Sequence, residues 1–372
     1  MKYVCSKCGK EYATDTDLWR CECGGAFWLK REEKVSFTKE DIKTDEFSMW
    51  RYEKAYPMKK KDLVATFGEG LTPLVPEEWD GVPVWLKNEA LMPTGSFKDR
   101  GVVMLINSLA ARGVDKITED SSGNAGASVS SYAAKAGIEC NVFVPASTSE
   151  GKVTQVIAAG ARIHKIPGLR LKAAEAAQSG AEGVYASHNW NPYFVEGVKS
   201  MAYEIWEQSG FTAPDNIVCP AGNGSIPLGL EQGFRELLEN GQVDRLPKIF
   251  GVQPENCNPI YRKFYGKDDN FEATATIAEG IALSFSSHRD EVVKAVRNTN
   301  GKMVSVSEDE ILKALRRIMK KGYYIEPTSC AAFAGASQLI QAGDLPQGEK
   351  TVIVISGNGL KASEKILHYL QQ

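Results

Sequence analysis

Residues 93–100 read Pro93-Thr94-Gly95-Ser96-Phe97-Lys98-Asp99-Arg100, which places a lysine directly after a Gly-Ser turn and at the start of an expected helix. The positive end of the helix dipole disfavours an ammonium group at this position. The placement therefore helps to keep the amine of Lys98 neutral and able to attack an aldehyde. Most lysines near helix starts are simply solvated, so this stretch needs support from other parts of the chain.

The stretch lies in a region where short β-rich runs alternate with helical ones, from about Phe67 onward. Several runs, such as Ile353-Val354-Ile355, are almost continuously apolar, which suits strands covered on both faces of a sheet. The alternation predicts an α/β fold with two doubly wound parallel-sheet domains, in which ligands bind beyond the carboxyl ends of strands. Strands are expected at residues 82–87, 116–119, 140–145, 162–166, 183–186, 216–220, 249–253, 303–306 and 351–355. Helices are expected at residues 97–112, 125–136, 151–159, 171–179, 194–208, 226–240, 308–321, 329–341 and 361–369.

A second informative loop follows the expected strand 116–119. The free backbone N–H groups at the start of the next helix form an anion site that would fit a substrate carboxylate. The candidate substrate-binding residues are Ser121, Ser122, Gly123, Asn124 and Ala125. Asn124 can also donate a hydrogen bond to a ring hydroxyl. Taken alone, the loop is better interpreted as an ordinary helix N-cap turn.

Two further loops follow the expected strands 216–220 and 351–355. The first is rich in glycine and precedes a helix, so its backbone amides can curl around a phosphate. Its candidate phosphate-binding residues are Gly222, Asn223, Gly224, Ser225 and Ile226. The second begins with Ser356, whose hydroxyl can hydrogen-bond a pyridine nitrogen.

Together, the four loops supply what pyridoxal 5′-phosphate (PLP) requires. Lys98 would hold the cofactor as a Schiff base, Asn124 would meet its O3′ oxygen and Ser356 its ring nitrogen. The glycine loop would hold the phosphate, and Phe97 is a further candidate contact. We therefore expect a PLP enzyme that acts on a small amino acid.

At this point the chain resembles the fold type II PLP enzymes of the tryptophan synthase β-like group, and within them the threonine synthases. The matching stretches lie between about residues 66 and 361. They include residues 68–74, 276–281, 326–329 and 357–361, besides the Lys98 motif and the 121–126 loop. The resemblance implies a lyase of threonine biosynthesis that converts O-phosphohomoserine and water into threonine and phosphate. Lys98 would carry the proton transfers, and no histidine base is needed.

Three residues depart from the threonine synthase pattern. Met92 stands where the family often has asparagine, Phe194 where an arginine would grip the leaving phosphate, and Asn358 where the family has histidine. These departures keep open a related PLP enzyme, either a serine/threonine deaminase or a β-replacement synthase, acting on another hydroxy- or O-substituted amino acid. A third hypothesis is a non-catalytic ligand-binding or scaffold protein that uses the N-terminal cysteine segment as a docking element, but the retention of Lys98 argues against it.

Four of the eight cysteines cluster near the N-terminus as Cys5-x2-Cys8-x12-Cys21-x-Cys23. Four thiolates suit a closed tetrahedral zinc site, which has no open position for catalysis. The pattern therefore predicts a zinc-ribbon-like segment with a structural zinc ion, and unligated thiols are the alternative.

The composition excludes several classes of partner. A net charge of -3 gives no basic excess for binding nucleic acid, and no apolar run is long enough to span a bilayer. The first residues lack the apolar stretch of a signal peptide, so we expect a cytoplasmic protein. We also expect the protein to form a homodimer.

The chain is too long for one small core, so several domains are expected. The expected organisation is a zinc-ribbon-like segment at residues 1–30 and a linker at 31–65. Residues 66–100 and 191–372 are expected to form a large PLP-binding domain, and residues 101–190 a smaller mobile domain.

Overall fold

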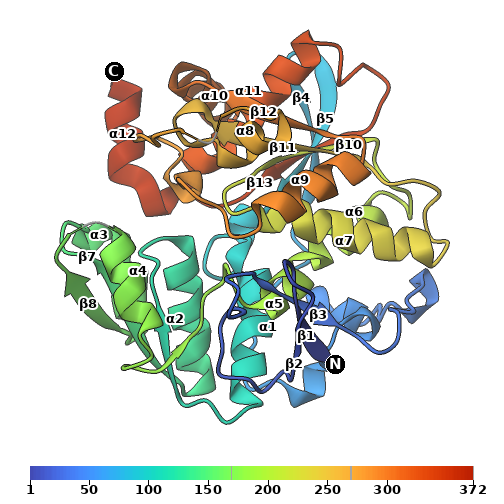
Figure 1. Ribbon diagram of the computed structural model, residues 1–372. Helices are drawn as coiled ribbons and strands as arrows, with labels where there is room; N and C mark the ends of the chain where they lie inside the picture. The colour runs from blue at the N-terminus through green and yellow to red at the C-terminus, as the bar shows by residue number, and fades with distance from the viewer. Residues whose placement is uncertain (169, 269, 372) are drawn as a thin grey trace. The chain divides into compact units, whose positions relative to one another are not determined.

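The structure, a computed structural model, describes residues 1–168, 170–268 and 270–371 (Figure 1). The chain divides into two compact units. Unit 1 comprises residues 1–36, 46–69 and 98–197, and unit 2 comprises residues 37–45, 70–97 and the chain from Val198 onward. The N-terminal residues and much of the expected linker therefore belong to the same unit as residues 101–190.

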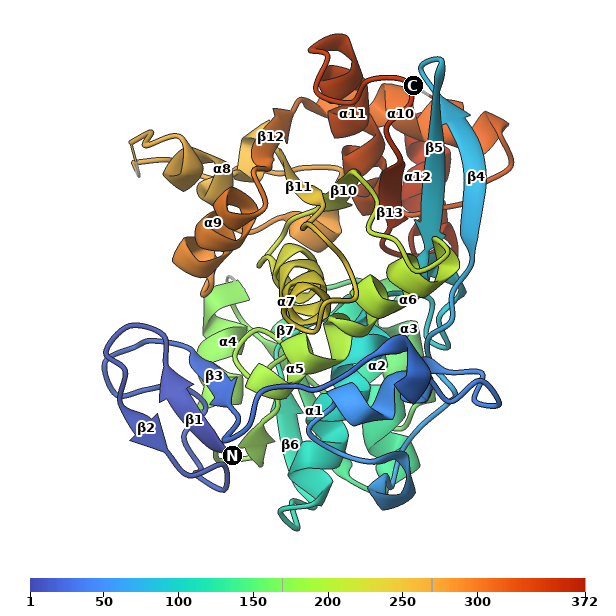
Figure 2. The same cartoon turned by 90° about the vertical axis from the view of Figure 1, so that its right-hand side faces the viewer.

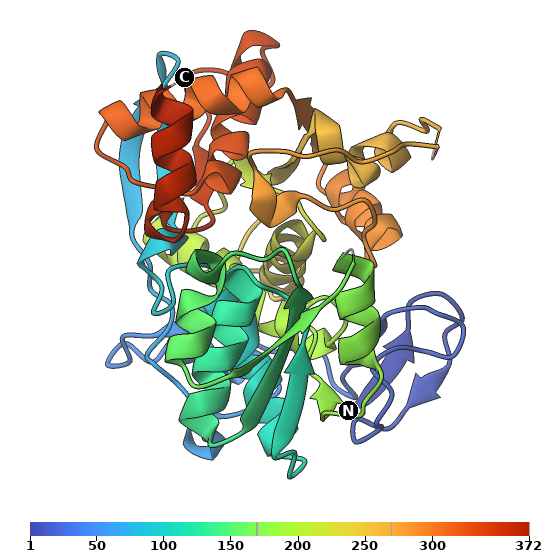
Figure 3. The same ribbon diagram turned by 90° about the vertical axis from the view of Figure 1, so that its left-hand side faces the viewer.

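Unit 1 contains a parallel sheet of four strands in the order β8-β7-β6-β9. Its interior is apolar, since Ile117 and Val142 are fully buried. Helices α2 and α4 both pack on β7, and Figure 3 shows them on opposite sides of the sheet. The elements are α1 (Lys98–Ala110), β6 (Lys116–Glu119), α2 (Asn124–Ala136), β7 (Glu139–Pro145), α3 (Glu150–Ala158), β8 (Arg162–Ile166), α4 (Arg170–Gln178), β9 (Val184–Tyr185) and α5 (Pro192–Val198).

A small antiparallel sheet at the N-terminus also belongs to unit 1. Its strands β1 (Lys2–Cys5), β2 (Glu11–Tyr12) and β3 (Phe27–Lys30) lie in the order β2-β1-β3 (Figure 2). Tyr3 stacks on Phe27 with ring centres 5.4 Å apart, and Arg31 forms an ion pair with Glu196 of α5 at 2.7 Å. The sheet is thus packed into unit 1.

Part of the expected linker is buried, although Lys59, Lys60 and Lys61 are exposed. It forms the 3-10 helices η1 (Lys39–Asp41), η2 (Met49–Ala55) and η3 (Lys60–Asp62). Trp50 is fully buried and its indole N–H donates to Glu69 Oε1 at 2.8 Å. This contact fixes η2 against the remainder of unit 1.

Unit 2 contains a six-stranded sheet in the order β12-β11-β10-β13-β5-β4. All neighbouring strands are parallel except β4, which pairs antiparallel with β5 in the hairpin of Figure 2. The strands are β4 (Leu74–Trp79), β5 (Val82–Asn88), β10 (Asn216–Pro220), β11 (Lys248–Pro254), β12 (Lys302–Val306) and β13 (Thr351–Ile355). The helices are η4 (Glu89–Leu91), α6 (Ser200–Gln208), α7 (Ser225–Glu239), η5 (Glu255–Cys257), α8 (Pro259–Phe264), η6 (Glu279–Ile281), α9 (Arg289–Asn298), α10 (Glu308–Lys320), α11 (Pro327–Gln341), η7 (Gly359–Ala362) and α12 (Ser363–Gln371).

The expected parallel α/β architecture is confirmed in the larger sheet of each unit. The antiparallel exceptions are β4 at a sheet edge and the small N-terminal sheet. Central strands are buried on both faces, and every residue of β13 is buried. None of the described helices combines the length and the apolar content needed to cross a bilayer.

Candidate functional site

Lys98 is the first residue of α1 in unit 1, as the Gly-Ser turn predicts. The next residue, Asp99, is fully buried and accepts a hydrogen bond from the Ser128 hydroxyl at 2.6 Å. This bond ties the first turn of α1 to α2. The Lys98 Nζ atom lies 5.2 Å from the centre of the Phe194 ring.

Phe194 is buried and packs beside Lys98. Its side chain is fully buried, and a Cβ atom at Gly101 would lie 2.4 Å from its ring. The His188 ring meets it edge-on at 5.7 Å between ring centres. The absence of a side chain at Gly101 therefore leaves room for the Phe194 ring beside the first turn of α1.

The 121–125 loop connects β6 to α2 in unit 1. Ser121 Oγ accepts a hydrogen bond from the Gly123 N–H at 3.3 Å. A Cβ atom at Gly126 would lie 1.9 Å from the Ser121 carbonyl oxygen, so glycine is required for this close turn. The first N–H groups of α2 have no acceptor within the helix, and an anion can take them.

The 222–226 loop connects β10 to α7 in unit 2. Gly224 has a left-handed φ of +94°, and a Cβ atom there would lie 2.1 Å from Val292 Cγ2. The Asn223 side chain is occupied by Ser287, donating to its Oγ at 2.9 Å and accepting from its N–H at 2.9 Å. The loop therefore offers the N-terminus of α7, and not the Asn223 amide, to a phosphate.

Ser356 follows β13 in unit 2 and is 1% exposed. Its hydroxyl donates to Glu326 Oε1 at 2.7 Å and lies 3.0 Å from the Ser329 hydroxyl. Since a serine hydroxyl has one proton, donation to a ring nitrogen requires the hydroxyl to turn away from Glu326. The backbone N–H of Phe97 donates to the Ser356 carbonyl at 3.0 Å, so the residue before Lys98 is held next to Ser356.

A pair of buried titratable groups in unit 1 was missed by reasoning from the sequence. His188 Nδ1 and Glu119 Oε1 lie 3.2 Å apart, with side chains 8% and 0% exposed. Burial raises the pKa of Glu119 well above its usual value, and the neighbouring Asp120 adds to this effect. Burial lowers the pKa of His188 well below its usual value, and the charges of Lys98 and Arg170 act in the same direction.

The structure brings the four N-terminal cysteines together. The sulfur atoms of Cys5, Cys8, Cys21 and Cys23 all lie within 4.8 Å of one another. Two of the Sγ–Sγ separations are 3.4 Å (Cys5 to Cys23) and 3.6 Å (Cys8 to Cys21). A Cβ atom at Gly25 would lie 2.5 Å from Cys5 Sγ, so the chain turns tightly behind the cluster.

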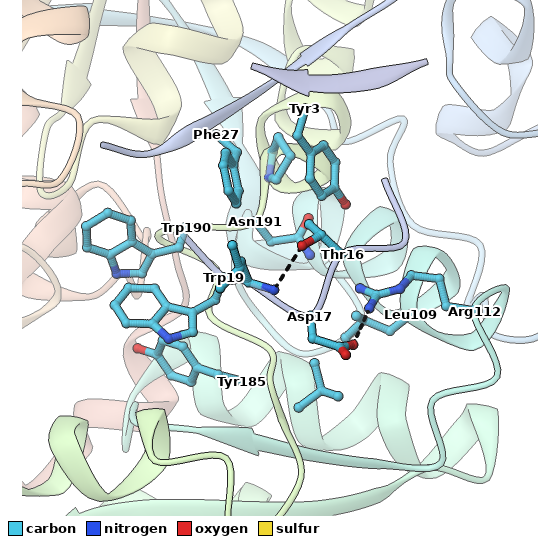
Figure 4. Close-up of a pocket in the computed structure, with 13 residues that line it drawn as sticks. Tyr3, Thr16, Asp17, Trp19, Phe27, Leu109, Arg112, Tyr185, Trp190 and Asn191 are labelled. Atoms are coloured by element: carbon cyan, nitrogen blue, oxygen red, sulfur yellow. Dashed lines mark hydrogen bonds and ion pairs between the residues drawn. The ribbon is translucent and has the colours of Figure 1, made fainter. Parts of the chain in front are cut away.

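A small cavity of about 30 Å³ lies elsewhere in unit 1, where the N-terminal residues pack beside β9 (Figure 4). Trp19 meets Tyr185 and Trp190 edge-on at 5.3 and 5.0 Å between ring centres. Arg112 forms an ion pair with Asp17 at 3.2 Å. The volume accommodates about one water molecule, so this cavity is a packing seam and not a substrate site.

Comparison with known proteins shows similarity over nearly the whole chain. Residues 65–357 match the family model described as "Pyridoxal-phosphate dependent enzyme". Threonine synthase of Methanocaldococcus jannaschii is 30% identical, over 96% of this chain and 92% of that protein. Threonine synthase of Methanosarcina acetivorans is 31% identical, over 99% of this chain and 94% of that protein. The similarity therefore includes the N-terminal cysteine segment.

Solved structures of similar fold carry other activities. Serine racemase from Dictyostelium discoideum is 25% identical, with a TM-score of 0.65 over 77% of this chain and 92% of that chain. The L-serine ammonia-lyase of Rhizomucor miehei is 21% identical, with a TM-score of 0.70 over 81% of this chain and 98% of that chain. At the latter identity, the likeness supports the fold alone.

Proposed function

Because the chain belongs to the family of pyridoxal-phosphate-dependent enzymes, we propose that it is a carbon–oxygen lyase similar to threonine synthase. The reaction would convert O-phosphohomoserine and water into threonine and phosphate. The observation that carries this proposal is the similarity to threonine synthases over 96–99% of the chain, together with a lysine at the start of α1.

The residues present fit the cofactor. Gly224 has a left-handed backbone and no room for a Cβ atom. It directly precedes the 15-residue helix α7, whose Ser225 and Ile226 N–H groups have no carbonyl acceptor within the helix. These groups and the helix dipole suit a phosphate. The residues proposed to hold the cofactor are Phe97, Lys98, Asn124, Gly222, Asn223, Gly224, Ser225, Ile226 and Ser356. When bound, PLP stores the electrons of a carbanion formed on the amino-acid substrate.

The protein's own residues supply binding and proton transfer. We propose that Lys98 Nζ takes and returns the protons at the reacting carbon atoms, because it is the amine at the start of α1. Ser121, Ser122, Gly123, Asn124 and Ala125, at the start of α2 and in the loop before it, would form the site for the substrate carboxylate. Buried aromatic surface at Phe194 excludes water beside Lys98 and so protects a reactive carbanion.

Product analysis tests this function. The purified enzyme with PLP is expected to release inorganic phosphate and threonine in equal amounts from O-phosphohomoserine. Release of ammonia and a keto acid from serine or threonine, without turnover of the phosphorylated substrate, would instead establish the deaminase alternative.

Phe194 is the observation that favours this alternative, since it stands where the family's arginine would grip a phosphate. We expect Phe194→Arg to lower the melting temperature without improving phosphate release, because the new guanidinium would be buried beside the Lys98 amine. Phe194→Leu, which changes the side chain without adding a charge, is the control. An enzyme built for another substrate would instead gain about 10-fold or more in kcat/KM on O-phosphohomoserine, the equivalent of one charge-assisted bond.

We propose one structural zinc ion per chain, bound by Cys5, Cys8, Cys21 and Cys23. Four thiolates at the usual Zn–S distance of about 2.3 Å lie about 3.8 Å apart in a tetrahedron. The separations of 3.4 and 3.6 Å are close to this geometry. Four protein ligands leave no position for a substrate.

The zinc proposal predicts that the double variant Cys8→Ser, Cys23→Ser loses the metal and part of its thermal stability, because the N-terminal sheet packs into unit 1. Cys140→Ser, which changes a buried cysteine on β7, serves as the control and should retain one zinc per chain. Metal analysis of the purified proteins provides the measurement. Equal zinc contents in the double variant and the control would contradict the proposed site.

We further propose that the enzyme is a cytoplasmic homodimer and that nucleic acid and membranes are not its partners. We also propose that residues 101–190 move during turnover. The net charge of -3 supports the absence of nucleic-acid binding. Light scattering would measure the assembly, and a monomeric mass would contradict the dimer. Identical structures of residues 101–190 and their surroundings, with and without a substrate analogue, would contradict the motion.

A further inference from the structure

The His188–Glu119 pair in unit 1 has no role in the proposed lyase reaction as described so far. Glu119 ends β6, immediately before the 121–125 loop, and His188 lies between β9 and α5. Glu119 is fully buried, and its Oε2 atom has no hydrogen-bond partner among the described residues. Because a buried carboxylate oxygen without a partner is costly, the arrangement calls for a functional explanation.

Phe194 connects this pair to Lys98. The Lys98 amine lies 5.2 Å from the centre of its ring, and the His188 ring meets the same ring edge-on at 5.7 Å. All three side chains belong to unit 1, and Phe194 is fully buried. His188 and Glu119 are buried and Lys98 is partly buried, and charges near a protein interior interact more strongly than in water.

The charged surroundings make the protonation of Glu119 depend on Lys98. Burial and Asp120 raise the pKa of Glu119, whereas positive charge on Lys98 or Arg170 lowers it. Burial raises the pKa values of Tyr185 and Cys140, and the charge of Glu119 adds to this effect. The Tyr185 hydroxyl donates a hydrogen bond to Asp120 Oδ1 at 2.9 Å. Burial and Asp120 therefore favour the neutral form of Glu119, and a charge on Lys98 favours its ionised form.

We propose that Glu119 and His188 are positioning residues that control the protonation of Lys98. The ionised Glu119 carboxyl group stabilises a proton on Lys98 Nζ, and the protonated amine in turn favours the ionised form of Glu119. His188 Nδ1, 3.2 Å from Glu119 Oε1, holds the carboxyl group in place. This inference rests on the proposed role of Lys98 in the lyase reaction.

The experiment is a pH titration of the visible absorbance of the enzyme with PLP bound and without substrate, which follows protonation of the Lys98–cofactor nitrogen. Glu119→Gln retains the size of the side chain but cannot ionise, so the protonated form loses its counter-charge. We expect the pH midpoint to fall by about one unit, since one unit corresponds to the loss of a single modest charge interaction. Glu139→Gln, the same change at a half-exposed position of β7, should leave the midpoint unchanged.

His188→Phe provides an independent test that keeps a ring against Phe194. Without the imidazole, the buried Glu119 carboxyl group loses its partner and stays protonated, so the midpoint should fall in the same direction. The double variant should shift no further than Glu119→Gln alone, because both changes remove one function. If Glu119→Gln fails to fold, His188→Phe carries the test.

A midpoint equal to that of the wild type in either folded variant would overturn the inference. Since the titration contains no substrate, its outcome is separate from that of the product analysis. An unchanged midpoint with normal phosphate release would overturn only the role of this pair, whereas a shifted midpoint with ammonia as the product would overturn only the proposed substrate.

Discussion

Replacement of Lys98 by alanine is expected to abolish turnover and the covalent attachment of the cofactor. The amine at the start of α1 is proposed both to hold PLP and to move the substrate protons, so one substitution removes both. A loss of at least about 1,000-fold in kcat is expected for a group with this combined role. Activity and visible absorbance of the purified variant provide the measurements.

Lys135→Ala is a suitable control because Lys135 is an exposed lysine of α2. This variant should keep its colour and its activity. A Lys98→Ala protein that still carries a borohydride-reducible cofactor would show that another lysine has the assigned role.

Replacement of Gly224 by alanine is expected to have the second largest effect, a loss of PLP affinity of at least about tenfold. The alanine Cβ atom would lie 2.1 Å from Val292 Cγ2 and would also sit on a backbone with a φ of +94°. The loop must shift, and each charge-assisted hydrogen bond lost from a phosphate is worth about 1.5–3 kcal/mol. Fluorescence titration of the apoenzyme with PLP measures the affinity.

Gly241→Ala separates loop displacement from backbone strain. Gly241 follows the other end of α7, also has a left-handed φ, +66°, and has nothing within 4 Å of an added Cβ atom. Strain of about 1–3 kcal/mol should lower its stability and leave PLP affinity unchanged. Equal losses of affinity in the two variants would mean that the 222–226 loop does not hold the phosphate.

The four candidate loops could be predicted because their signals are local. A buried apolar strand such as β13, a glycine such as Gly224 and the start of a helix are all visible in neighbouring residues. The structure places each of these loops where a strand ends, or, for Lys98, at the first residue of a helix. The structure also shows that the Asn223 side-chain amide is hydrogen-bonded to Ser287, which no local pattern reveals.

One missed element had a readable signal. The antiparallel strand β4 contains Pro76 and was not expected, but proline is tolerated on an edge strand. The two residues Asp80 and Gly81 connect β4 to β5 with left-handed φ values of +51° and +78°. An Asp-Gly pair between two apolar runs is a strong indication of a hairpin.

The His188–Glu119 pair could not be predicted by such reasoning. Its partners lie 69 residues apart in the chain, and their importance comes from burial and from the shared contact with Phe194. The packing of Trp50 into unit 1 is likewise a tertiary feature, since the surrounding residues are charged and irregular in sequence. Local patterns report loops and strands, whereas charge coupling in a core depends on the completed fold.

Peptide mapping after borohydride reduction identifies the lysine that holds the cofactor. Reduction of the purified enzyme fixes the cofactor to the amine that holds it, and mass spectrometry of the digested protein then identifies the modified residue. We predict a pyridoxyl-phosphate group on Lys98, in the peptide that contains Ser96 and Phe97. A modification on any other lysine, or an unmodified Lys98 in a coloured protein, would contradict it.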